Sequence, residues 1–332
     1  MRLLIVRSFD LSIPMRLRYS FLAITCLWTG LPHMASAQSA VDPSRQTEAI
    51  TVRPAVTPLR SDVALDSGGG TEFDSFAPLS SGDDDIGEQL ILRQKEKVQR
   101  FSVAADSLVM WTDNAAHASA GEIDDAFWGW RVAADWQPVI SGGLMAPVGI
   151  SQSWYRYDEI DALDFETLDV NAGLAYLAPE LGNVMFFAQY QFERVTQYSD
   201  ELMNSHSVRA GAQHLLLLNR RNSIQSAVYA DVDIDNDVDA LKRNEYIASV
   251  AWRFKLTRKV ETVLGYRYTC FDYAEIDRLD HLHLIDLSLI YTPFKWLQVY
   301  ASAAYGFNQS SLDVYDYEAG TLGGGLGLRI RF

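Results

Sequence analysis

The segment WLQVYASAAYGF, residues 296–307, alternates two series of side chains. The first series is apolar and the second is mixed: Leu297, Val299, Ala301, Ala303, Tyr305 and Phe307 alternate with Trp296, Gln298, Tyr300, Ser302, Ala304 and Gly306. Successive side chains of a β-strand point to opposite faces, so a period of two predicts a strand with one apolar face. Residues 184–192 and 245–255 show the same alternation.

The same search along the chain predicts twelve strands. They lie near residues 98–112, 125–137, 144–158, 165–178, 183–198, 204–219, 222–233, 242–257, 259–273, 279–292, 295–309 and 317–332. Their length exceeds the roughly 5–6 residues usual in soluble sheets and the roughly 9–11 needed to cross a bilayer at a tilt. An even number of long, two-faced strands predicts an all-β fold, a transmembrane antiparallel up-and-down β-barrel of about 12 strands.

The first 37 residues predict an export signal. A basic stretch after Met15, an apolar run over residues 19–31 and the small residues Ala35-Ser36-Ala37 follow one another. This order is that of a secretory signal peptide, and Met15 is an alternative start to Met1. Removing residues 1–37 takes away four arginines and one aspartate, which deepens the net charge from −15 to −18.

Residues 38–97 differ from the rest of the chain because Phe73 and Phe76 are their only aromatic residues. A segment this poor in large apolar side chains cannot fold alone. We therefore expect a disordered N-terminal segment that serves as a linker or as a plug. Within it, Asp85 as an N-cap predicts a short helix over residues 86–97. The barrel then spans residues 98–332.

The predicted connections alternate between short turns and longer loops, as in membrane barrels. The longer loops hold half of the acidic residues of the exported chain and its whole net negative charge, which places an acidic rim at one end. Asp233, Asp235, Asp237 and Asp239 form one acidic loop, with a spacing similar to calcium loops. Val238 and Asn244 replace the glycine and the closing glutamate of an EF-hand. We expect a solvated loop that holds divalent ions loosely, and no metal site.

Charged residues fall on the strand face opposite the apolar one, and a charge facing lipid would cost about 2–4 kcal/mol. We therefore place them inside the barrel as pore-lining residues. They are Asp106, Arg131, Asp135, Asp169, Glu193, Arg209, Glu245, Arg253, Glu261, Arg267, Asp286, Arg329 and Arg331, with Lys255 beside them. Two interpretations stay open, since these groups either line a polar pore or pair across the lumen and close it.

The chain ends in Gly325-Leu326-Gly327-Leu328-Arg329-Ile330-Arg331-Phe332. This ending resembles the C-terminal signature of bacterial outer-membrane β-barrels, which has a terminal Phe (Phe332), an apolar residue two before it (Ile330) and a Gly five before it (Gly327). The resemblance implies the outer membrane of a Gram-negative cell, contact with its lipid, and recognition of the last strand by the barrel-assembly machinery. Size and acidic loops are similar to those of the loosely defined β-barrel porins.

Catalysis and nucleic-acid binding have little support in the sequence. His281, His283 and the pair His206-Ser207 do not match the motif of outer-membrane phospholipases, and the acidic balance argues against a nucleic-acid partner. We expect no enzyme and no cofactor. The predicted function is a narrow porin-like channel for passive diffusion of small solutes. The alternative is a closed structural or surface-interaction barrel that works through its acidic extracellular loops.

Overall fold

A computed structural model of the chain describes residues 100–332. The predicted export signal, the segment 38–97 and its helix lie outside the described residues, as do the first two residues of the strand predicted from residue 98. Twelve long strands form the barrel. They are β1 (Phe101–Thr112), β2 (Asp125–Trp136), β5 (Val148–Tyr157), β6 (Phe165–Ala178), β7 (Val184–Gln197), β8 (Asp200–Leu217), β9 (Asn222–Asn236), β10 (Asn244–Lys255), β11 (Val260–Tyr273), β12 (Arg278–Phe294), β13 (Leu297–Ser310) and β14 (Tyr317–Arg331).

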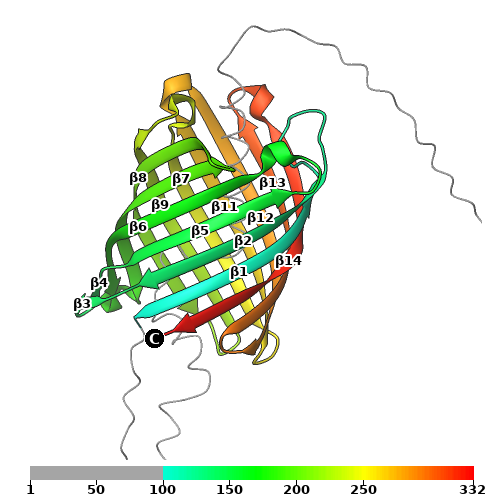
Figure 1. The fold of residues 1–332 in the computed structure, drawn as a ribbon. Helices are drawn as coiled ribbons and strands as arrows, with labels where there is room; N and C mark the ends of the chain where they lie inside the picture. The colour runs from blue at the N-terminus through cyan, green and yellow to red at the C-terminus, as the bar shows by residue number, and fades with distance from the viewer. Residues whose placement is uncertain (1–99) are drawn as a thin grey trace, which may run out of the picture.

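The barrel closes between its first and last strands. Each strand pairs antiparallel with its neighbours, and β1 pairs with β14 from Ser102 opposite Arg331 to Thr112 opposite Thr321. The two strands run side by side around the tilted wall (Figure 1). The all-β, twelve-strand antiparallel barrel predicted from the alternation is therefore confirmed.

The two ends of the barrel differ. At one end, here called the loop end, the connections carry short 3₁₀ turns: η2 (Asp161–Leu163), η4 (Asp239–Leu241), η5 (Ala274–Ile276) and η6 (Asp313–Tyr315). At the other, the turn end, lie η3 (Pro179–Leu181), the tight hairpins of β8–β9, β10–β11 and β12–β13, and the C-terminus. Within residues 100–332, no helix has the length and hydropathy of a membrane span.

One predicted strand begins later than expected. The strand predicted from residue 144 begins at Val148, because Pro147 has no N–H to donate to a ladder. The preceding residues form a small hairpin, β3 (Val139–Ser141) and β4 (Leu144–Met145), around Gly142 with φ of 54°. Strand β4 also pairs with β6, opposite Tyr176 and Ala175. This link at the turn end is therefore longer than a simple turn.

One predicted loop is a tight turn. Residues 199–203 were expected to be a loop, whereas β8 begins at Asp200 and pairs with β7 up to Gln197. Tyr198 takes a left-handed conformation with φ of 57°, which turns the chain within two residues. Its hydroxyl donates a 2.6 Å hydrogen bond to Asp164 Oδ2, and this bond raises the pKa of Tyr198. The turn is thus fastened to the neighbouring loop.

Candidate functional site: the inner wall

The inner wall consists of the strand residues that alternate with the exposed apolar ones. On β12, for example, Asp286 is 6% exposed, whereas Ile285 and Leu287 on either side are 46% and 53% exposed. Neighbouring strands keep this alternation in register around the closed barrel. All the residues that the sequence places in the lumen lie on the inner wall: Asp106, Arg131, Asp135, Asp169, Glu193, Arg209, Glu245, Arg253, Lys255, Glu261, Arg267, Asp286, Arg329 and Arg331.

Charged groups of the inner wall pair between adjacent strands. Arg209 donates through Nε and Nη2 to Asp231 Oδ2, at 2.9 and 2.7 Å, directly across the β8–β9 ladder. Arg253 Nη1 on β10 lies 3.2 Å from Glu261 Oε1 on β11. These two bridges run along the wall rather than across the lumen. Asp231 belongs to this set, although it is not among the residues predicted to line the lumen.

A relay of hydrogen bonds joins three strands in the same way. Arg131 Nη2 on β2 donates to Ser151 Oγ on β5 at 3.0 Å, and Ser151 Oγ donates to Asp169 Oδ2 on β6 at 3.2 Å. The serine therefore connects a cation and an anion that are two strands apart. On β1, Ser102 Oγ donates to Asp135 Oδ2 of β2 at 3.2 Å.

Two buried arginines at the loop end were not predicted as part of the inner wall. Arg243 Nε lies 3.1 Å from Glu245 Oε1, and both side chains are under 10% exposed. Arg278 Nε donates to both carboxylate oxygens of Asp280 at 2.9 Å, with each side chain 2% exposed. The spacing of two between each arginine and its acid puts the partners on one strand face, and this signal was available.

These arginines form an arginine–aromatic stack with Phe271, Tyr273 and Tyr315. The guanidinium of Arg243 lies 4.2 Å from the ring centre of Phe271 and 5.4 Å from that of Tyr273. The guanidinium of Arg278 lies 4.2 Å from the same Tyr273 ring and 3.6 Å from Tyr315. Cation–π contacts of this kind strengthen when they are desolvated. The stack fixes β10, β11 and β12 to the loop that contains η6.

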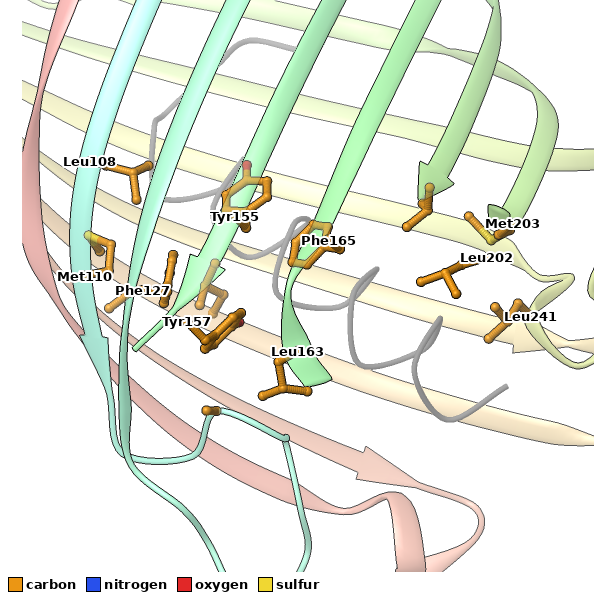
Figure 2. Close-up of a cluster of buried hydrophobic side chains, with 14 residues drawn as sticks. Leu108, Met110, Phe127, Tyr155, Tyr157, Leu163, Phe165, Leu202, Met203 and Leu241 are labelled. Carbon is orange, nitrogen blue, oxygen red and sulfur yellow. The ribbon is translucent and has the colours of Figure 1, made fainter. Parts of the chain in front are cut away.

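The inner wall is not polar throughout, which corrects the expectation of a polar inside. Near the loop end it carries an apolar band, shown in Figure 2 with its side chains pointing to the barrel interior. The band comprises Leu108, Met110, Ala115, Phe127, Tyr155, Tyr157, Leu163, Phe165, Val195, Leu202, Met203, Leu241, Leu284 and Ala304. The inward face was predicted from the positions of charged residues alone. At the loop end, however, apolar residues occupy both faces of the strands.

A small polar group lies on the inner wall beside two members of this band, Leu284 and Ala304. Ser288 on β12 and Ser302 on β13 are register partners, and each is 3% exposed. Asp286 lies two residues before Ser288 on β12, and its carboxylate folds over Gly265 of β11. A Cβ at position 265 would lie 2.0 Å from Asp286 Oδ1. Glycine at this position is what allows the carboxylate to pack against the wall.

Several acidic residues of the loop end are structural. Asp125 is 4% exposed and accepts hydrogen bonds from the backbone N–H groups of Ala126, Glu159 and Ile160. Asp164 is equally buried and accepts from the N–H of Tyr157 at 2.7 Å. The acidic rim expected from the sequence is therefore partly a set of buried loop anchors.

The four aspartates of the acidic loop do not converge. Asp233 is half-buried on β9, and Asp235 is exposed beyond a bulge between His206 and Ser207 that shifts the register. Asp237 accepts from Asn204 N at 2.8 Å and Nδ2 at 3.1 Å, and Asp239 begins η4. Across the described part of the chain, no three His, Cys, Asp or Glu side chains gather as a metal site would need.

The C-terminal residues take distinct positions in β14 and beyond it. Gly327 lies opposite Asp106, and Ile330 faces outward at 54% exposure. Phe332 donates its N–H to Phe101 O at 2.8 Å, and its own O accepts from Arg100 N at 2.9 Å. The rings of Phe101 and Phe332 are 5.9 Å apart. The signature residues thus lie at the seam where the barrel closes.

The histidines considered for catalysis lie on the outward face, where each contacts a tyrosine. Tyr268 Oη and His281 Nδ1 are 2.8 Å apart, and Tyr266 Oη and His283 Nδ1 are 2.9 Å apart. His206 contacts Tyr190 in the same way. Adjacent residues of a strand point to opposite faces, so His206 and Ser207 diverge. This geometry does not bring a base and a nucleophile together.

No model of a protein family matches the chain, and a search of curated proteins finds no match. Among solved structures, an outer membrane channel from Pseudomonas putida F1 aligns with 76% of this chain and 100% of its own, with a TM-score of 0.52 and 11% identity. The translocator domain of autotransporter NalP from Neisseria meningitidis aligns with 71% of this chain and 90% of its own (TM-score 0.39, 10% identity). An anion-selective porin from Comamonas acidovorans aligns with 69% and 98% (TM-score 0.35, 9% identity). The alignment with the Pseudomonas putida protein shows that the chain shares the fold of that outer-membrane β-barrel.

Proposed function

We propose that this protein is an outer-membrane channel through which small polar solutes diffuse passively. The observation that carries the proposal is the inner wall of a closed twelve-strand barrel, which holds charged side chains as pairs along the wall. Barrels of about eight strands are filled by their own side chains, whereas 16–18 strands leave a wide aqueous channel. Twelve strands fit a narrow channel. Pairs of opposite sign give such a wall little preference between cations and anions.

The outward face supports a place in a membrane. Exposed aromatic side chains occur near both ends of the strands, with Trp136 and Trp296 at the turn end and Trp111, Tyr246 and Tyr305 at the loop end. Exposed aliphatic side chains such as Leu287 and Leu264 lie between them. Two aromatic girdles around an apolar zone match the polarity profile of a bilayer. Outer-membrane lipid is the partner of this surface.

The C-terminal strand is the part that the barrel-assembly machinery would read, with Gly327, Ile330 and Phe332 as its contacts. Replacing Phe332 by Ala should lower the amount of heat-modifiable folded barrel in the outer membrane of an expressing cell. Val314→Ala, at a 69% exposed loop residue, provides the matched control. Equal amounts of folded barrel from both variants would contradict recognition of this strand by the barrel-assembly machinery.

Planar-bilayer recording of the refolded protein tests the channel. Both the full chain and a variant lacking residues 38–97 are reconstituted, and heat-denatured protein serves as the control. Discrete current steps from either form support a channel. Silence from both would refute it and favour a closed barrel that works through its loops, an alternative to which the buried arginine–aromatic stack lends support.

A further inference from the structure

Three polar side chains lie together on the inner wall, in the middle part of the β12–β13 ladder. They are Asp286, Ser288 and Ser302, here called the serine–aspartate cluster. The two serines are register partners, and Asp286 lies two residues from Ser288 on the same face of β12. All three residues are therefore neighbours on one surface that faces the barrel interior.

The wall does not satisfy the hydrogen bonding of this cluster. Asp286 is 6% exposed and each serine is 3% exposed. Among residues 100–332, no hydrogen bond reaches Asp286 Oδ2, Ser288 Oγ or Ser302 Oγ. Other inner-wall serines are satisfied, since Ser102 and Ser151 each donate to an aspartate. A buried polar atom without a partner costs free energy and is rare, so three at adjacent positions point to a ligand.

The larger side chains beside the cluster lean away from it. The carboxylate of Asp286 lies over Gly265 of β11, and the side chain of Tyr300 reaches over Gly325 of β14, where a Cβ would lie 2.6 Å from Tyr300 Oη. Ser302 is opposite Gly323, which has no side chain and is partly exposed. Short side chains therefore form the wall at the two serines, and a solute can approach them from the side of β14.

We propose that the serine–aspartate cluster is a binding site for a neutral polyhydroxylated solute, such as a sugar. This inference rests on the proposed channel function for the passage of that solute, but not for its binding. A hydroxyl both donates and accepts, so a ring with several hydroxyls can pair with two serines and a carboxylate at once. The cluster extends roughly 7 Å along β12 and roughly 5 Å across to β13, a spread that suits a sugar ring.

A single ammonium group matches the cluster less well. Its three N–H donors need three acceptors around one point. The carboxylate of Asp286 instead turns toward β11, whereas Ser302 lies on the opposite side of β12. Arg267, two residues from Gly265 on the inner wall of β11, also acts on Asp286 with its positive charge. The charge at the cluster is thus balanced locally, which favours an uncharged solute.

Saturation-transfer difference NMR with maltose tests the site on the full chain refolded in detergent. The wild type should give a saturable maltose signal. Ser288→Ala combined with Ser302→Ala should weaken the apparent affinity at least about tenfold, because two hydrogen bonds are lost. Ser153→Ala combined with Ser249→Ala, at inner-wall serines of β5 and β10, is the matched control and should leave the affinity unchanged.

The single serine variants replace the double variant if the latter does not fold. Equal maltose affinities of the cluster variant and the control variant would overturn the site. A saturable, serine-dependent signal from ethanolamine with none from maltose would overturn the uncharged class of solute.

The NMR readout does not depend on current, so the site and the channel can fail separately. A silent barrel that binds maltose through the two serines would refute the channel and keep the site. A conducting barrel that gives no saturable maltose signal would refute the site and keep the channel.

Discussion

Arg278 and Asp280 show how a charge is kept inside this barrel. Each side chain is 2% exposed, and each compensates the charge of the other at the loop end of β12. Removing one partner of a buried pair leaves an uncompensated charge, which costs about 3–5 kcal/mol. Arg278→Met should therefore lower the free energy of unfolding by about 3 kcal/mol in urea titrations of the protein refolded in liposomes. The double variant Arg278→Met/Asp280→Leu should recover most of this loss. A double variant as unstable as the single one would show that the pair itself is not the source.

A second effect at the scale of single residues concerns Gly265. A methyl group at this position would lie 2.0 Å from Asp286 Oδ1, so Gly265→Ala must displace the carboxylate. Overpacking of this kind costs about 1–3 kcal/mol. The same unfolding titration should show this loss for Gly265→Ala in the wild-type background and little change in an Asp286→Ala background. Equal losses in the two backgrounds would mean that the glycine is needed for another reason.

At the scale of elements, each strand has one face for lipid and one for the interior. Leu287 lies in the middle of β12 and is 53% exposed on the outer face. An arginine at the bilayer midplane costs about 2–4 kcal/mol, whereas one in a solvated loop costs little. Leu287→Arg should therefore destabilise the refolded barrel by that amount in liposomes, and Val314→Arg in η6 should leave stability unchanged. Similar effects of the two substitutions would argue that the outer face is not in contact with lipid.

The strands could be predicted from the sequence because each depends on local alternation. Their ends fall within a few residues of the prediction wherever a turn follows directly. The hairpin of β3 and β4 was not predicted, because the residues before Val148 are apolar enough for a strand. Pro147 interrupts that run, and β5 begins after it. The turn at Tyr198 also differs from the prediction. The acidic residues after it indicated a loop, but they pair with β7 as the start of β8.

The parity of each strand also predicted which charged residues share the inner wall. It could not predict their partners, because pairs such as Arg209 with Asp231 depend on the register between two strands. Arg243 and Arg278 were not predicted as part of the inner wall for the related reason that their burial comes partly from rings on other elements. The apolar band could not be inferred from alternation, since it becomes a single surface only when the barrel closes.

At the scale of the whole molecule, exposed acids at the loop end should set the ion preference of the channel. Asp235, Glu275 and Asp277 are exposed there, and replacing them by Asn, Gln and Asn removes three negative charges. The reversal potential in a KCl gradient should then move toward lower cation preference. The shift should be larger at 0.1 M than at 1 M salt, because the Debye length falls from about 10 to 3 Å. Glu180→Gln, at the turn end, is the control. An unchanged reversal potential would assign the preference to the inner wall.

The seam between β1 and β14 has a consequence for the order in which the molecule is made. Strands β2 to β13 each pair with strands that are close to them in sequence, but β1 pairs with β2 on one side and with the last strand of the chain on the other. Until β14 pairs with β1, both edges of the sheet expose unpaired backbone groups, which is the state most prone to pairing with another chain. Contacts between residues so far apart in sequence also form slowly. The interval before β14 docks on β1 is therefore when a newly made chain is most exposed to aggregation and proteolysis.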